Sequence, residues 1–207
     1  LELKRVGFDS DIITGNGKGD PLVSCCECGL VFNDTALLQD AFHDYYDNRA
    51  NNNAGVGLGA GLLSDLDVKH YSRVFSILEK YCLPQKRVVD VGCGRGGFLQ
   101  YLSQQGYQNI SGIDLDAQNI QYIRDELKMD AIQGSAGKIL DVEVDVLVYN
   151  FIFEHIIDLQ EAVQAAWNSL KEDAFLFVEV PDVEAYVDHP FFPHYHLALH
   201  EHINHFS

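Results

Sequence analysis

Short apolar runs and segments with helical spacing alternate along the chain after Pro84. The runs at 87–91, 109–114, 144–150 and 174–180 are rich in branched residues and predict buried strands, and a weaker strand is predicted at 130–133. Between them, residues 97–105, 117–128 and 158–170 have the spacing of amphipathic helices. Apolar strands that alternate with helices predict an α/β fold with a Rossmann-like, doubly wound, mostly parallel sheet that is covered on both faces.

The part of the chain before Pro84 has a different organisation. Ser64, followed three residues later by Asp67, predicts a helix that starts with a capping box. Apolar residues then recur at helical spacing, at Val68, Tyr71, Phe75 and Leu78. Residues 48–61 hold four Asn and four Gly and predict a flexible linker, and a short helical pattern lies at 35–48. We therefore expect a small cysteine-containing appendage at 1–47, a linker at 48–61 and one main domain at 62–207.

Composition narrows the class of protein. Of 207 residues, 47% are hydrophobic and 22% are charged, which is typical of a soluble globular protein. The net charge of -17 repels phosphate, so nucleic acid and anionic membranes are disfavoured partners. No apolar run approaches the ~20 residues that a membrane-spanning helix needs. Five cysteines, of which only three cluster, form no disulfide framework and fit a reducing cytoplasm.

The segment 88–102 joins a strand to a helix through a glycine-rich loop. Gly92, Gly94 and Gly97 satisfy the G-x-G-x-x-G pattern of dinucleotide sites, although a glycine turn without any ligand remains an alternative. Asp90 at the end of the strand opposes an anionic pyrophosphate and favours a cationic ligand. The loop thus favours a cofactor other than a dinucleotide.

The arrangement D-x-G-x-G-x-G at Asp90, Gly92, Gly94 and Gly96 resembles motif I of the class I S-adenosylmethionine-dependent methyltransferases. In that family the glycine loop, which here includes Cys93, faces the amino-acid moiety of the cofactor. The resemblance implies that Asp114, 24 residues after Asp90, binds the ribose hydroxyls and that Leu115 packs beside the adenine.

Residues 144–182 resemble the fourth strand, the Glu-His turn, the following helix and the fifth strand of the same family. This likeness implies that Asn150 and Phe151 lie beside the cofactor. The turn after the third strand carries Ser135 and Ala136, where the family usually has an acidic residue for the adenine amino group. The family's sheet ends in an antiparallel strand pair, and only 26 residues follow Pro181. We therefore expect this sequence to stop before that pair and to leave strand 174–180 with an unpaired edge. Coverage of the edge by another chain, such as a second copy in a homo-oligomer, is favoured, and the alternatives are that the tail folds over it or that the sequence is a marginally stable fragment.

Cys25 and Cys28 form a C-x-x-C pair. Zinc in structural sites has four ligands, and the sequence contains no second pair. The surrounding residues resemble the second half of a zinc-binding segment that precedes some sugar C-methyltransferases. Free thiols packed in a small turn are therefore the favoured interpretation for this sequence, and zinc at Cys25 and Cys28 is expected only in a longer chain.

Six of the nine histidines lie between 189 and 205. His196 and His200 are one helical turn apart, but the HExxH zinc signature is absent, so a packed or substrate-facing segment is favoured over a metal site. Residues 200–207 resemble an acceptor-site segment of sugar C-methyltransferases in which His202 matches the family's His, while Leu199 and His205 stand in place of two Tyr. His155 is a second candidate.

These patterns together predict methyl transfer from S-adenosylmethionine to a small-molecule acceptor, such as a sugar or another metabolite. His202 is the expected general base, because the pKa of an imidazole lies near neutral pH. Two alternatives remain open: a non-catalytic binding module with the methyltransferase shape, and a nicotinamide-dependent oxidoreductase.

Overall fold

The computed structural model of the chain describes residues 3–5, 22–33, 63–137, 143–182 and 202–206. These residues fall into two compact units. One unit takes its residues from Leu1–Gln39, Phe151–Ile157 and Glu179–Ser207, and the other from Asp40–Asn150 and Asp158–Val178. The first unit contains a four-stranded sheet and the second is built on a five-stranded sheet.

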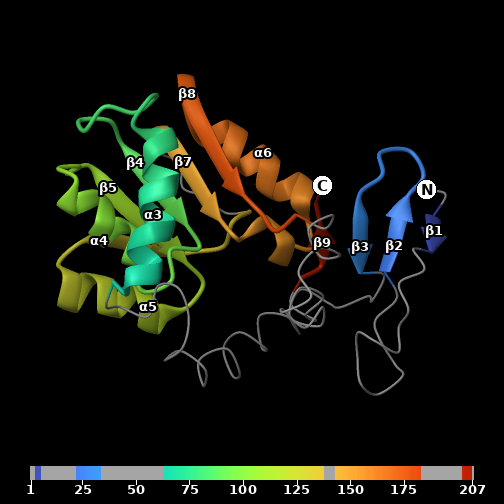
Figure 1. Cartoon of the computed structure of the whole chain (residues 1–207), viewed down its shortest axis with the longest axis horizontal. Helices are drawn as coiled ribbons and strands as arrows, with labels where there is room; N and C mark the ends of the chain where they lie inside the picture. Colours follow the sequence, from blue (N-terminus) through green and yellow to red (C-terminus); the bar gives the residue numbers. More distant parts are fainter. Residues whose placement is uncertain (1–2, 6–21, 34–62, 138–142, 183–201, 207) are drawn as a thin grey trace. The chain divides into compact units, whose positions relative to one another are not determined.

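The five-stranded sheet has the order β6-β5-β4-β7-β8. Its strands are β4 (Val88–Val91), β5 (Ile110–Asp114), β6 (Asp130–Gln133), β7 (Val144–Asn150) and β8 (Leu170–Glu179). Figure 1 labels four of these strands, β5, β4, β7 and β8. β4 pairs in parallel with β5 and β7, and β5 pairs in parallel with β6. The chain starts in the middle of the sheet, builds outward to β6, and then returns to the other side of β4. This order confirms the predicted doubly wound fold and makes β4–β7 the switch point, where open α/β sheets bind ligands.

The helices of this unit begin where the sequence offers capping side chains. They are α3 (Asp65–Leu78), α4 (Gly97–Gln104), α5 (Ala117–Tyr122) and α6 (Leu159–Ser169). The predicted capping box is present: Ser64 Oγ accepts from the N–H of Asp67, whose carboxylate accepts from the N–H of Ser64. The helix predicted at 117–128 continues from α5 into a π-helical turn, η2 (Ile123–Leu127), which ends at Lys128 with a left-handed φ of 57°.

Both faces of the central strands are buried, as expected for a parallel sheet. On one face, Val88 of β4 joins a core with side chains from α3, α4, α5 and η2. Val89 and Val91 alternate with it and are equally buried toward the opposite face. On α3 the buried apolar residues are Tyr71, Val74 and Leu78, whereas Val68, which the spacing placed on the apolar stripe, is 41% exposed.

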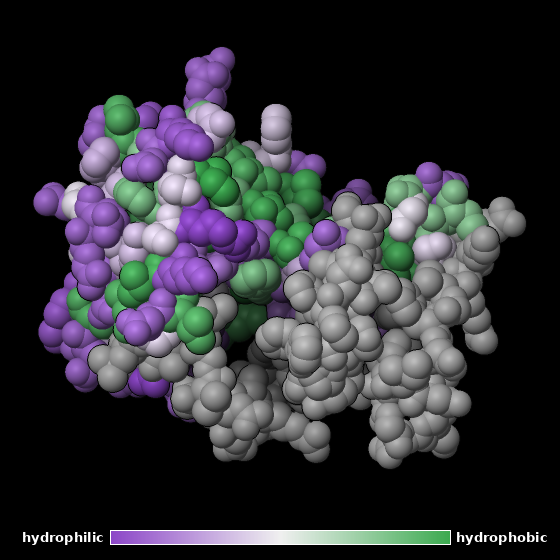
Figure 2. All heavy atoms as spheres, in the orientation of Figure 1, coloured by the Kyte–Doolittle hydropathy of each residue, from purple (hydrophilic) through white to green (hydrophobic). Residues whose placement is uncertain are grey.

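β8 lies at one end of the strand order among the described residues. Apolar side chains gather over β8 and α6 on the surface in Figure 2. Phe175, Leu176 and Val178 of β8 are 37–42% exposed, and Trp167 of α6 is 75% exposed. The predicted apolar strand at the sheet edge is therefore confirmed for the described part of the chain, while its coverage by a partner or a second copy stays a prediction.

The four-stranded sheet has the order β1-β2-β3-β9, and all its pairings are antiparallel. Its strands are β1 (Leu3–Arg5), β2 (Leu22–Cys25), β3 (Val31–Asn33) and β9 (Asn204–His205). β2 and β3 form a hairpin around the cysteine turn, and β9 joins it from the other end of the sequence. A short 3₁₀ turn, η3 (Phe153–His155), belongs to the same unit.

Several predictions concern residues outside the described ranges. These are the helical pattern at 35–48, the linker at 48–61, and the tail residues Leu199, His196 and His200. The domain bounds 1–47, 48–61 and 62–207 stay predictions.

Candidate functional site

The glycine loop between β4 and α4 has the conformation that its sequence requires. Gly92, Gly94 and Gly96 have φ values of 74°, 51° and 79°, in the left-handed region that favours glycine. The N–H groups of Gly92 and Cys93 donate to the carbonyl of Ile113 at 2.7 and 3.0 Å, which ties the loop to the end of β5. The loop therefore turns sharply and keeps its backbone at the carboxyl end of the sheet.

Strand register places three predicted site residues side by side. Val91 is aligned with Ile113 of β5 and with Tyr149 of β7. Each of these three residues is followed by a predicted site residue, which is Gly92 after Val91, Asp114 after Ile113 and Asn150 after Tyr149. Gly92, Asp114 and Asn150 therefore form one row at the ends of three neighbouring strands. Because parallel strands end at the same edge, the row lies at the switch point of the sheet.

Asp114 links the glycine loop to the second strand. Its Oδ2 accepts from the N–H of Gly94 at 2.8 Å, and its Oδ1 accepts from the N–H of Asp116 at 2.9 Å and from the amide of Asn119 at 3.2 Å. Burial raises the pKa of Asp114, and these three donors act in the opposite direction. Each carboxylate oxygen has two lone pairs, so Oδ2 keeps acceptor capacity for one hydroxyl of a ribose.

Asp90 and Asn150 are buried polar groups whose bonding is incomplete. Asp90 is 3% exposed, and burial together with the charge of Asp114 raises its pKa to about 8. Its Oδ1, and both amide atoms of Asn150, have no hydrogen-bond partner within the part of the chain that the structure describes. Buried polar atoms are usually paired, so these groups are candidates for contact with a polar ligand.

The remaining predicted cofactor residues lie on the segments that follow these strands. Leu115 comes directly after Asp114 and is 39% exposed. Ser135 and Ala136 follow β6, whose end is held by the N–H of Gly134 donating to the carbonyl of Asp114 at 2.9 Å. Phe151 follows Asn150 and has a left-handed φ of 55°. The role of each of these residues toward a cofactor stays a prediction.

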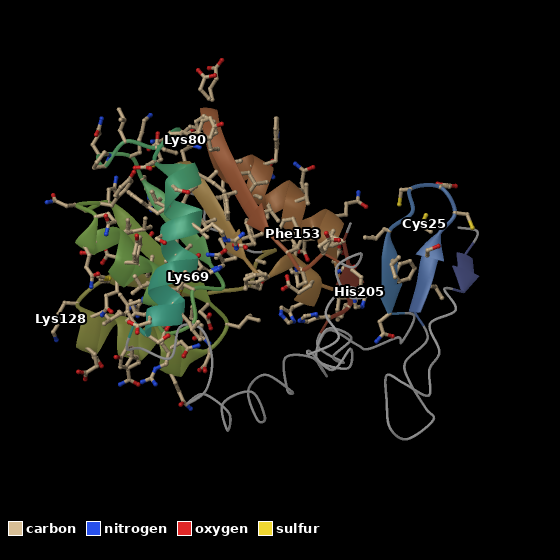
Figure 3. The ribbon with its side chains drawn as sticks, viewed as in Figure 1. Cys25, Lys69, Lys80, Lys128, Phe153 and His205 are labelled. Atoms are coloured by element: carbon tan, nitrogen blue, oxygen red, sulfur yellow. The ribbon has the colours of Figure 1, made fainter. Side chains whose placement is uncertain are left out.

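Two histidines predicted as catalytic candidates lie together in the first unit. The rings of His155 and His202 meet edge to face with their centroids 4.9 Å apart. The N–H of Ile203 donates to the carbonyl of Glu154 at 2.6 Å, and the amide of Asn204 donates to the carbonyls of Phe153 and Ile156. These backbone contacts hold the segment at 202–206 against η3; Figure 3 labels Phe153 and His205 on the two segments.

Glu154 is the site residue that sequence reasoning missed. Its side chain is 1% exposed, and burial, with a smaller effect of the charge of Glu179, raises its pKa to about 7. Its Oε1 lies 3.9 Å from Nε2 of His155. The neighbouring His205 is also buried. Burial, together with the charge of His202, lowers the pKa of His205 to about 4. A glutamate directly before a candidate histidine was a signal for this cluster, but burial of a carboxylate cannot be read from the sequence.

Cys25 is the last residue of β2 and Cys28 lies in the turn that leads to β3; Figure 3 labels Cys25. The N–H of Gly29 donates to the carbonyl of Cys25 at 2.9 Å, and that of Cys25 donates to the carbonyl of Leu30 at 2.9 Å. The N–H groups of Cys28 and Glu27 lower the pKa of the Cys25 thiol. All five cysteines are free, and no described residue adds a third ligand to Cys25 and Cys28, so zinc at this pair stays a prediction.

Comparison with known proteins identifies the family. Residues 67–207 match the family described as a methyltransferase domain, which is more than half of the chain. The chain belongs to this family. The ribosomal protein L11 methyltransferase of Staphylococcus aureus is 29% identical over 129 residues, which cover 58% of this chain and 38% of that protein. The chain thus spans less than half the length of the curated relatives that it matches.

Solved structures agree on the fold. The PH0226 protein from Pyrococcus horikoshii OT3 aligns with a TM-score of 0.53 at 22% identity, over 60% of this chain and 63% of that one. A coclaurine N-methyltransferase, bound to N-methylheliamine and SAH, aligns with a TM-score of 0.53 at 15% identity, over 82% of this chain and 54% of that one. The resemblance to class I S-adenosylmethionine-dependent methyltransferases is therefore confirmed. None of the helices that the structure describes has the length and apolarity to cross a membrane.

Proposed function

We propose that this chain binds S-adenosylmethionine at the row formed by Gly92, Asp114 and Asn150 and transfers its methyl group to a small-molecule acceptor. The observation that carries the proposal is the meeting of this row with the buried Asp90 at the carboxyl ends of β4, β5 and β7. The bound cofactor would supply a sulfonium methyl group that is already electrophilic, so the protein's main task is to position the acceptor.

The residues of the row have separate functions in this proposal. Asp114 accepts hydrogen bonds from the ribose hydroxyls, and the loop from Gly92 to Gly96 lets the backbone approach the amino-acid moiety closely. Leu115, Ser135 and Ala136 border the adenine. Asn150 and Phe151 lie beside the methyl-donating end of the cofactor.

An oxygen or carbon nucleophile must lose a proton during the transfer. In this proposal a histidine accepts the proton as a general base, with His202 as the first candidate and His155 as the second. The pair is supported by its contact in the structure and by the resemblance of residues 200–207 to an acceptor-site segment. The five free cysteines support a cytoplasmic location as part of the same proposal.

Two binding titrations and one transfer assay test the proposal. Calorimetry with S-adenosylmethionine and with NAD should show binding of the first only, because Asp90 and Asp114 oppose a pyrophosphate. Transfer of labelled methyl groups to a panel of metabolites, with ribosomal protein L11 as a protein acceptor, then distinguishes the acceptor classes. Binding without transfer to any acceptor would favour the non-catalytic module, and NAD binding would favour the oxidoreductase.

The second candidate, a protein acceptor, is favoured by one observation, the similarity to an enzyme named for ribosomal protein L11. The aligned region covers only 38% of that enzyme, so the similarity bears on the cofactor-binding part rather than on recognition of the acceptor. Methylation of L11 at a rate above that of every small molecule would replace the small-molecule proposal.

A further inference from the structure

Three potential metal-ligating side chains converge in the first unit. One carboxylate oxygen of Glu154 and one ring nitrogen each of His155 and His202 all lie within 4.8 Å of one another. Glu154 and His155 come from η3, and His202 precedes β9, so the cluster joins segments that are nearly fifty residues apart in the sequence. The hydrogen bonds from Ile203 and Asn204 to the backbone of η3 fix this arrangement.

Glu154 supplies an independent observation. Its side chain is 1% exposed, yet neither carboxylate oxygen accepts a hydrogen bond from any other described residue. The 3.9 Å separation from Nε2 of His155 is too long for a hydrogen bond. A buried carboxylate without hydrogen bonds is costly unless it is paired or coordinates a metal. The buried carboxylate of Glu154, with the His155 ring 3.9 Å away, is therefore a group that a cation would stabilise.

We propose that Glu154, His155 and His202 bind one divalent transition-metal cation of the Zn²⁺ class. One carboxylate and two imidazoles form a donor set that suits Zn²⁺ and related ions, and three protein ligands leave a coordination position open. Ligand atoms at about 2.1 Å from a tetrahedral ion lie about 3.4 Å apart. Side-chain rotations that move the three ligand atoms by about 1 Å would therefore close the cluster around the ion.

The open position gives the site a chemical role that deepens the proposed function and rests on it. A cation lowers the pKa of a bound hydroxyl group and orients it. An acceptor hydroxyl at that position would release its proton to solvent water without a strong base, and His155 and His202 would then act as metal ligands rather than as the proton acceptors. Cation binding itself does not depend on methyl transfer and can be measured separately.

The experiment measures Zn²⁺ binding by calorimetry on protein stripped of metal with a chelator. The Cys26→Ser/Cys28→Ser variant serves as the parent, because these exposed thiols would otherwise bind Zn²⁺ themselves. We expect one equivalent of Zn²⁺ in the parent. Glu154→Gln and His155→Asn should each weaken binding at least about 100-fold, since even the loss of outer partners costs 10–100-fold. His70→Asn, on α3, is the matched control and should leave the affinity unchanged.

Absence of Zn²⁺ binding in the parent, or an affinity in both ligand variants equal to that of the parent, would overturn the metal site. His155 is 22% exposed in its side chain, so His155→Asn remains decisive if Glu154→Gln proves unstable. Titration of the same samples with S-adenosylmethionine separates the two proposals: a protein that binds the cofactor but no Zn²⁺ refutes only the metal site. One that binds Zn²⁺ but no cofactor refutes only the proposed function.

Discussion

Asp90→Asn tests whether Asp90 is held as a neutral acid in the core. Burial and the charge of Asp114 raise the pKa of Asp90 from 3.8 to about 8 in the folded chain. Between these two values the folded chain keeps a proton that the unfolded chain has released. This residue therefore contributes stability that is complete below pH 3.8 and is lost as the pH rises to about 8. The corresponding slope in the free energy of unfolding is about -1.4 kcal/mol per pH unit.

The assay is urea unfolding without cofactor at pH 5, 6 and 7 for the wild type and Asp90→Asn. Because asparagine does not titrate, the variant should lose this slope, and the difference between the two proteins should change by about 1.4 kcal/mol per pH unit. Asp125→Asn, at an exposed position of η2, is the matched control and should parallel the wild type. Parallel lines for the wild type and Asp90→Asn would show that Asp90 is ionised when folded and would refute the reasoning.

Three further variants probe the site and its support. Asp114→Ala should weaken S-adenosylmethionine binding by ~1–3 kcal/mol in calorimetry, the size of a lost charge-assisted hydrogen bond; an unchanged affinity would remove Asp114 from the site. Although burial opposes it, the N–H of Arg87 and the ammonium groups of Lys171 and Lys86 lower the pKa of Asp145 to about 2. Asp145→Ala should cost about 1–2 kcal/mol of stability at pH 7, a value reduced because both lysines are over a third exposed. The difference in the free energy of unfolding between the wild type and Asp145→Ala should shrink as the pH falls from 3.8 toward 2. Denaturant unfolding that shows a constant difference over this range would contradict this account. Gly112→Ala would place a Cβ 2.5 Å from Sγ of Cys93, so thermal unfolding should reveal a loss of ~1–3 kcal/mol, and an unchanged midpoint would be evidence against this close packing.

The parallel sheet was predictable because its strands are buried on both faces. A strand such as Val144–Asn150 must then be almost wholly apolar, and its bounds match the predicted ones. The glycine loop was predictable for the same kind of reason, since Gly92, Gly94 and Gly96 all adopt left-handed φ values that few other residues tolerate.

Features set by distant contacts were not predictable. Val68 has the spacing of a core residue but is exposed, because the packing of α3 selects Val74 instead. The pairing of β3 with β9 joins residues more than 170 positions apart, and two-residue β9 has no strand pattern of its own. The position of Glu154 beside His202 depends on the hydrogen bonds from Ile203 and Asn204 to η3, which join residues almost fifty positions apart, so the sequence named the histidines without their carboxylate neighbour. β8 begins at Leu170 rather than at residue 174, directly after α6, without the loop that the sequence suggested.

The charges around Asp90 and Asp114 bear on which class of cofactor binds at this site. Asp90 and Asp114 are both buried, and the charge of Asp114 helps to raise the pKa of Asp90. The described residues place no ammonium or guanidinium group in hydrogen-bond contact with either carboxylate. Two buried acidic groups without a cationic partner lower the stability of the fold. An anionic pyrophosphate at this edge would add to the repulsion, whereas a cationic ligand would offset it and favour the ionised form of Asp90. Because the pKa of Asp90 is about 8, this residue is mostly protonated at pH 7, so binding of S-adenosylmethionine should release up to one proton from this pair, whereas binding of a dinucleotide should release none.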